Sequence, residues 1–145
     1  MITNIKSQDF DLLFEIEQKA HPVPWSKGTL LNNQGERYLN LKLIEEDQIV
    51  GFVICYKTLD EATLFNIAVD PESQGKGYGK RLLNSLILQL KQQGIITLWL
   101  EVRESNRKAI QLYQHLDFVE VDIRKNYYPT TNGNKENAIV MALYL

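Results

Sequence analysis

Ten consecutive residues, "QGKGYGKRLL" (74–83), place the tightest limit on what this chain can fold into. Three of them are glycine and three are cationic, and they lie between an apolar strand-like run and an amphipathic helical pattern. Glycine is favoured where the backbone must be left-handed or must lie close to a ligand. The N-terminus of a helix adds partial positive charge and free N–H groups. The stretch therefore predicts a strand, an anion-binding loop and a helix in succession.

The residues on either side of this loop predict a crossover between two parallel strands. Residues 62–69 and 95–102 are strand-like, and Gly94 lies where a helix commonly ends. The helix between them has an apolar stripe made of Leu82, Leu83, Leu86, Ile87 and Leu90. A strand, helix and strand connected in this way form a right-handed crossover.

The rest of the pattern favours antiparallel pairing. Further strands are expected at 2–6, 38–45, 49–58, 118–125 and 136–143, and further helices at 9–20, after Ser26 and at 106–116. The links between the strands are short, and "TTNGN" (130–134) is typical of a hairpin turn. We therefore expect an α+β fold: a mixed, mostly antiparallel sheet of about seven strands with about four helices on its faces, in one domain spanning 1–145.

Composition excludes several classes of protein. The net charge of −2 argues against a bulk nucleic-acid binder. No run of about 18 apolar residues is present, and the early acidic residues do not resemble a signal peptide, so we expect no membrane association. The single cysteine, Cys55, lies in an apolar run and is expected to be a core thiol in the cytoplasm. The two histidines, His21 and His115, are isolated, so no metal site is expected.

Two common phosphate loops fit this stretch poorly. A Walker loop needs one more residue and a hydroxyl where Arg81 stands. A dinucleotide fingerprint accounts for Gly75 and Gly77, but Lys80 occupies the place of its third glycine, and "DPESQ" separates the loop from its strand.

The order Gln74-x-x-Gly77-x-Gly79 resembles the pyrophosphate loop of the Gcn-five-related N-acetyltransferases (the GNAT superfamily). Three longer stretches, "DEATLFNIAVDPESQGKGYGKRLL", "LWLEVRESNRKAIQLYQHLDF" and "RKNYYPTTNG", resemble its RimI-type ribosomal-protein-alanine N-acetyltransferase branch. The resemblance also covers "HPVPWS" (21–26) and "NQGERY" (33–38). It implies the GNAT fold and acetyl-CoA as cosubstrate. It further implies direct transfer of acetyl, in a ternary complex, to the N-terminal alanine of the small-subunit ribosomal protein numbered eighteen.

The resemblance also implies two catalytic residues. Glu101 resembles the family's proton acceptor. It shares a strand face with Trp99, and from its position alone it could equally lie at an exposed edge or pair with Arg103 or Arg107. Tyr113 resembles the proton donor to the departing thiolate, although its place on an apolar helical stripe is also typical of a core tyrosine.

Binding roles follow from the same resemblance. Asn106 would contact the coenzyme, or simply cap the helix that it precedes. Tyr127 and Tyr128 would line the acceptor site, unless they only end an aromatic strand, and Trp25 would form the opposite wall or a core anchor. The residues expected to bind the coenzyme are Ile67, Ala68, Val69, Gly75, Lys76, Gly77, Tyr78, Gly79, Lys80 and Asn106.

Two other functions are compatible with these residues. The same fold could acetylate lysine side chains or small amines, or the chain could be a non-catalytic sensor of acyl-CoA. The sequence leaves the acceptor protein and the oligomeric state open, with a monomer favoured.

Overall fold

The computed structural model describes residues 1–145. Its strands are β1 (Ile2–Asn4), β2 (Leu41–Glu45), β3 (Gln48–Thr58), β4 (Glu61–Val69), β5 (Thr97–Arg103), β6 (Val119–Pro129) and β7 (Lys135–Tyr144). Its helices are α1 (Phe10–Ala20), α2 (Lys27–Asn32), α3 (Tyr78–Gln92) and α4 (Arg107–His115), with 3-10 turns at Ser7–Asp9 and Pro71–Ser73. The predicted number of strands and helices is confirmed.

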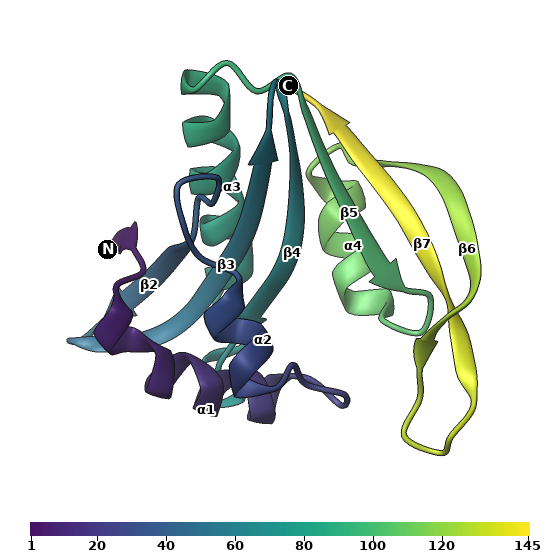
Figure 1. The fold of residues 1–145 in the computed structure, drawn as a ribbon, viewed down its shortest axis with the longest axis horizontal. Helices are drawn as coiled ribbons and strands as arrows, with labels where there is room; N and C mark the ends of the chain where they lie inside the picture. The colour runs from purple at the N-terminus through teal and green to yellow at the C-terminus, as the bar shows by residue number, and fades with distance from the viewer.

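The seven strands form one mixed sheet in the order β1-β2-β3-β4-β5-β7-β6 (Figure 1). Every neighbouring pair is antiparallel except β4 and β5, which are parallel and are connected through α3. Both the mostly antiparallel sheet and the single parallel crossover were predicted from the sequence, and both are confirmed.

Helices cover both faces of the sheet. One face of β3 and β4 packs against α1 and α2, with Phe10, Leu13 and Leu30 buried against Phe52 and Ile54. The opposite face packs against α3 and α4 in the larger core cluster, which also contains Cys55. The thiol is fully buried, and this burial raises the pKa of Cys55 to about 12, as expected of a core thiol.

The ends of several elements differ from the expected ones. Strand β2 starts at Leu41 rather than 38, because Tyr38 makes only an isolated bridge with Tyr56. Strand β6 continues to Pro129 instead of ending at 125, with irregular pairing to β7 along the way. On α4 the buried residues are Ile110 and Tyr113.

The two parallel strands pair over only part of their length. Glu61–Leu64 of β4 pairs with Thr97–Leu100 of β5, and no pairing continues beyond these residues. From there β4 stays with β3 and β5 stays with β7, so the two strands diverge toward the end of the sheet that carries α1 (Figure 1). The sheet therefore contains a V-shaped opening between its two halves.

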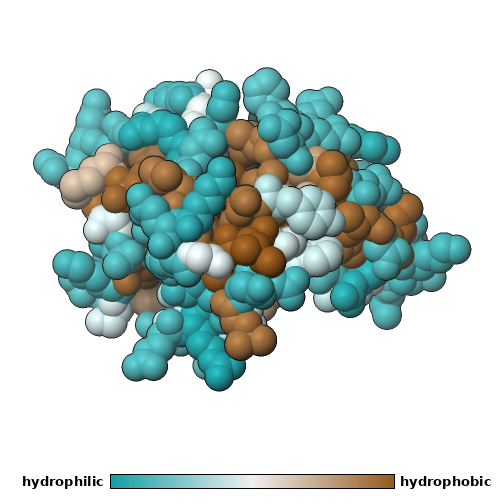
Figure 2. Space-filling model, turned by 90° about the horizontal axis from the view of Figure 1, so that it is seen from above, coloured by the Kyte–Doolittle hydropathy of each residue, from teal (hydrophilic) through white to brown (hydrophobic).

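The end of the molecule where these strands are joined carries exposed apolar side chains. Figure 2 shows apolar surface there, interspersed with polar side chains. Leu59 in the β3–β4 turn, Ile96 before β5 and Tyr144 at the end of β7 are all exposed. No helix is long and apolar enough to cross a membrane.

Candidate active site

A cleft of about 610 Å³ lies where β4 and β5 separate. Ile67 of β4 and Glu101 of β5 line it, together with residues of α4 and β6 and the loop after α1. Because α1 and α4 lie on opposite faces of the sheet, the cleft joins the two faces through the V-shaped opening.

The divergence leaves backbone groups of β4 without a strand partner. The N–H of Asp70 donates to the carbonyl of Val50 at 2.8 Å, which fixes the alternation of hydrogen bonds between β3 and β4. In that alternation the N–H groups of Ile67 and Val69 point away from β3, toward the opening. These two residues therefore offer donors to the cleft.

The other predicted residue of this segment, Ala68, lies differently. Its Cα is opposite Phe52, at a position where the backbone groups of β4 point toward β3, and its side chain is buried against α1. The carbonyl of Val69 is also occupied, since it accepts a hydrogen bond from Gln74 Nε2 at 3.1 Å. The structure thus brings Ile67 and the N–H of Val69 to the opening, but not the polar groups of Ala68.

The glycine loop presents a row of free donors. The six consecutive N–H groups from Gly75 to Lys80 donate to no acceptor in the protein, and the first helical bond runs from Arg81 N–H to the carbonyl of Gly77 at 3.0 Å. Gly75 and Gly77 both have φ +79°, and a Cβ on either would meet open space. This concave, uncapped start of α3 fits a diphosphate.

The cations beside the loop are not equally available. Lys76 and Lys80 are exposed and form no ion pair, whereas Arg81 lies 2.6 Å from Glu45 Oε1. The hydrogen bond from Arg81 lowers the pKa of Glu45. Two of the three predicted positive charges near the loop are therefore free to attract an anion.

Glu101 lies on β5, an inner strand of the sheet, one residue beyond Leu100, where the pairing of β5 with β4 ends. Its expected partners Arg103 and Arg107 are wrong, since its Oε2 lies 3.2 Å from Nε of Arg124, on β6. That oxygen is buried and makes no hydrogen bond of good geometry. About a quarter of the side chain is exposed, and the residue lines the cleft.

Tyr113 reaches the cleft from the α4 side. It is 5% exposed and packs against Phe118, with ring centroids 5.6 Å apart, so its predicted core position is confirmed. Its hydroxyl nevertheless makes no hydrogen bond within the protein, and the residue lines the cleft. Burial, and secondarily the neighbouring Tyr128, raises the pKa of Tyr113, which keeps the phenol protonated at neutral pH.

The two neighbouring tyrosines of β6 differ in position. Tyr128 lines the cleft, and burial, followed by the negative charge of Glu101, raises the pKa of Tyr128 to about 12. Tyr127 is 46% exposed and does not line the cleft, although its ring contacts that of Tyr128 edge-on at 5.0 Å. Only one of the two predicted acceptor-site tyrosines therefore faces the opening.

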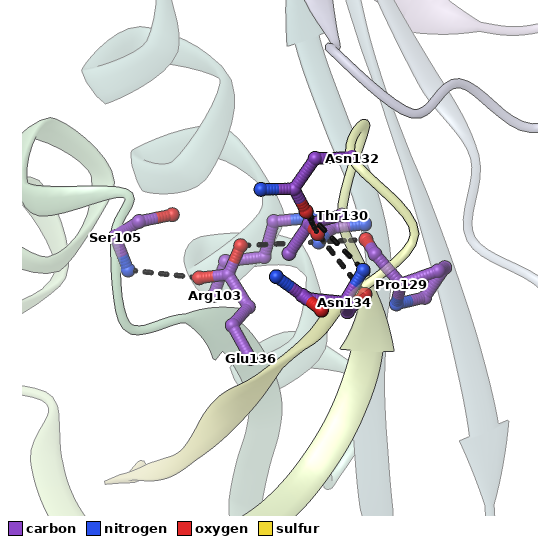
Figure 3. Close-up of polar contacts among 7 residues, drawn as sticks. All are labelled: Arg103, Ser105, Pro129, Thr130, Asn132, Asn134 and Glu136. Atoms are coloured by element: carbon purple, nitrogen blue, oxygen red, sulfur yellow. Dashed lines mark hydrogen bonds and ion pairs between the residues drawn. The ribbon is translucent and has the colours of Figure 1, made fainter.

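Sequence reasoning missed the contacts that hold this hairpin beside the cleft. Arg103 Nη1 donates to the carbonyl of Pro129 at 2.7 Å and to Glu136 Oε2 at 3.3 Å (Figure 3). The other oxygen of Glu136 accepts from the N–H of Ser105 at 3.1 Å. The guanidinium of Arg103 also lies 4.5 Å from the centre of the Tyr128 ring. Arg103 therefore connects β5 to both strands of the hairpin.

Asn106 lies at the start of α4, and the helix-cap interpretation is confirmed. Its Oδ1 accepts a hydrogen bond from the N–H of Ala109 at 3.3 Å. Its Nδ2 has no partner in the protein, and the residue lines the cleft. Capping therefore leaves a donor free to bind a ligand.

The wall opposite the hairpin is formed by the loop that follows α1. Trp25 lines the cleft and also packs against the core under α1, so both of its predicted positions hold. Its N–H donates to Oε2 of the buried Glu17 at 3.0 Å. Sequence reasoning missed Glu17, although its spacing from Leu13 placed it on the apolar face of α1.

Comparisons with known proteins agree with this geometry. The model of the acetyltransferase (GNAT) family matches residues 5–118. A Haemophilus influenzae protein named [ribosomal protein bS18]-alanine N-acetyltransferase is 66% identical over 145 residues, covering 100% of this chain and 99% of that protein. The crystal structure of the ribosomal-protein-S18-alanine N-acetyltransferase from Escherichia coli superposes with a TM-score of 0.96 at 52% identity, covering 99% of this chain and 92% of that one. Arabidopsis thaliana NAA60 in complex with acetyl-CoA shares the fold, with a TM-score of 0.86 at 16% identity over 100% of this chain and 98% of that one.

Proposed function

The chain belongs to the acetyltransferase (GNAT) family, and on that premise we propose that it transfers acetyl from acetyl-CoA to the N-terminal alanine of ribosomal protein bS18. The observation that carries this proposal is 66% identity, over the whole chain, to a protein named for that activity. The cleft that joins the two faces of the sheet supports it, because two substrates can meet there from opposite sides.

The coenzyme binds along α3, β4 and α4. The free N–H groups of the loop from Gly75 to Lys80 hold its diphosphate, with Lys76 and Lys80 adding positive charge. Ile67 and Val69 pair with its amide-containing arm, and Asn106 Nδ2 donates to the same arm. Bound acetyl-CoA supplies an activated thioester.

The acceptor enters from the face that α1 covers, between the loop that carries Trp25 and the hairpin wall that carries Tyr128. An N-terminal amine has an ordinary pKa of about 7.7–8.0, so a modest base suffices to deprotonate it. Glu101 accepts a proton from the nitrogen, directly or through a water, as the amine attacks.

Two further groups act as the bond to sulfur breaks. The N–H of Val69 donates to the thioester oxygen as negative charge develops on it. Tyr113, which stays protonated at neutral pH, donates its proton to the leaving sulfur. No covalent acyl-enzyme is needed, and the buried, unreactive Cys55 takes no part.

We assign the chain a single catalytic domain over 1–145 that acts as a monomer in the cytoplasm, where it meets its ribosomal-protein substrate. The proposed acceptor is an α-amine, which separates this proposal from acetylation of lysine or of small amines.

A substrate panel tests the proposed function. Purified protein and acetyl-CoA are incubated with a peptide that begins with Ala, with the same peptide blocked at its N-terminus and carrying an internal lysine, and with a polyamine. Mass spectrometry should find acetyl only on the free Ala terminus. Acetylation of the lysine or of the polyamine contradicts the assigned acceptor, and coenzyme binding without transfer to any acceptor supports the sensor alternative.

A further inference from the structure

Three polar side chains meet on the α1 side of the cleft, and the proposed reaction leaves them without a role. Glu17 of α1 is 1% exposed and Asn66 of β4 is 8% exposed, while His21, directly after α1, lines the cleft. Asn66 Nδ2 donates to Glu17 Oε1 at 2.8 Å, and the N–H of Trp25 donates to Glu17 Oε2. A buried side-chain amide and a backbone N–H therefore fix the carboxylate.

This arrangement fixes the hydrogen on His21. A carboxylate only accepts hydrogen bonds, so Asn66 must turn its Nδ2 to Glu17 and its Oδ1 to His21. His21 Nε2 lies 3.1 Å from that oxygen and must therefore carry a hydrogen. In the neutral ring the lone pair is then on Nδ1.

The free nitrogen of His21 is open to a bound molecule. Nδ1 has no partner in the protein, and 29% of the side chain is exposed along the cleft. Glu17 Oε1 lies 3.6 Å from Nε2, so the carboxylate and the imidazole lie close together. On the opposite wall, by contrast, one oxygen of Glu101 faces the guanidinium of Arg124.

We propose that His21 is a second proton acceptor for the acceptor amine, acting on the α1 side of the cleft; this rests on the proposed function. An N–H bond of the α-ammonium breaks and a bond from that hydrogen to Nδ1 forms, directly or through one water. The freed lone pair of the amine attacks, Glu101 accepts the second N–H proton as the amide bond forms, and the imidazolium then releases its proton to solvent. The charged or titratable groups that line the same cleft are Glu17, Glu101, Arg103, Tyr113 and Tyr128.

The two histidines of the chain give a matched pair of variants. His115 is exposed at the end of α4 and does not line the cleft, so His115→Ala is the control for His21→Ala. With the Ala peptide, His21→Ala should lower kcat at least tenfold, since proton transfer by a positioned side chain contributes about 10²–10⁴-fold and Glu101 remains. Affinity for acetyl-CoA should stay unchanged, and the melting temperature should fall slightly, because His21→Ala leaves Asn66 Oδ1 without its donor. Added imidazole should restore part of the rate of His21→Ala and leave His115→Ala as it was.

His21→Gln separates proton transfer from a positioning role. Its amide can still donate to Asn66 Oδ1 but has no basic nitrogen. If His21 accepts the proton, the kcat of His21→Gln should be as low as that of His21→Ala. Wild-type turnover by His21→Gln overturns the proposal, and so does a rate of His21→Ala that added imidazole fails to raise. The activity of the wild-type protein on the Ala peptide tests the proposed function, whereas the ratio of kcat between the His21 variants and the wild type tests the role of His21. The proposed function and the role of His21 can therefore fail separately.

Discussion

The glycine loop and the cleft beside it offer groups of different origin to their proposed substrates. The loop offers the backbone N–H groups of six residues in sequence, Gly75 to Lys80, and its shape depends on two left-handed glycines. The cleft offers side chains from five separate segments, and some of them, such as Asn66 and Glu101, are fixed by contacts to residues far away in the sequence. A substitution in the loop should therefore act through the local backbone, whereas one in the cleft should act through a network.

The largest effect should come from the side chain that faces the acceptor in the cleft. Glu101→Gln removes a proton acceptor but keeps the size of the side chain, so kcat for the Ala peptide should fall about 10²-fold or more. Affinity for acetyl-CoA, measured by calorimetry, should change little, because the loop is untouched. Glu104→Gln, just beyond the end of β5, is the matched control and should keep the wild-type rate.

Tyr113→Phe belongs to the same test of the cleft. The hydroxyl makes no hydrogen bond in the protein and the ring stays packed on Phe118, so the free energy of unfolding should hardly change. The steady-state rate should still fall, by about tenfold or more, through loss of the proton donor. Full turnover by both this variant and Glu101→Gln would remove the assigned catalytic pair.

The next effect concerns the loop. Gly77→Ala places a Cβ on a residue with φ +79°, which costs about 1–2 kcal/mol. If the loop leaves that conformation, the same free energy corresponds to about a tenfold loss of affinity for the coenzyme. Gly94→Ala is the control, since Gly94 has φ +80° and equally open surroundings, but lies at the other end of α3. Both variants should lose similar stability, and only Gly77→Ala should bind acetyl-CoA more weakly.

An equal loss of affinity in both glycine variants would show that the loop matters only for folding. A normal affinity in Gly77→Ala would show that the row of free N–H groups does not bind the diphosphate.

The same contrast explains what could be predicted from the sequence. Three features depend on residues close together in the chain: the glycine loop, the crossover through α3 and the cap at Asn106. All three could be predicted from the spacing of residues in the sequence. The Glu17–Asn66 hydrogen bond joins residues 49 positions apart, and the Glu101–Arg124 pair depends on a strand whose register shifts. Local patterns do not specify such contacts.

Tyr127 and Tyr128 illustrate this limit. Which of the two faces the cleft depends on the irregular pairing between Arg124 and Tyr128, and a shift of one residue would exchange their sides. The sequence could place both residues in the hairpin but could not choose between them.

A smaller effect is expected from the contact that holds this hairpin. Arg103→Lys keeps the charge but loses the planar guanidinium that reaches Pro129, Glu136 and the Tyr128 ring. Loss of about 1 kcal/mol of hydrogen bonding should raise the KM for the Ala peptide about fivefold and leave the KM for acetyl-CoA unchanged. Arg37→Lys is the control, because the guanidinium of Arg37 donates to Tyr56 away from the cleft. A rise in both KM values would mean that Arg103 supports the whole sheet rather than one wall.

The smallest effect is the part that the cleft contributes to the dependence of stability on alkaline pH, in addition to the part that comes from the buried thiol of Cys55. Burial and Glu101 raise the pKa of Tyr128 to about 12, against about 10 in an unfolded chain. Between these values the folded state binds more protons than the unfolded state, so this contribution is complete below pH 10 and is lost as the pH rises toward 12. Tyr128→Phe has no proton to lose, so its free energy of unfolding, from denaturant titrations, should fall less steeply than that of the wild type across this window. Tyr113→Phe should act in the same direction, since burial also raises the pKa of Tyr113. If both variants keep the wild-type slope, the two phenols are not desolvated by the cleft, and the contrast between a solvated loop and a desolvated cleft is lost.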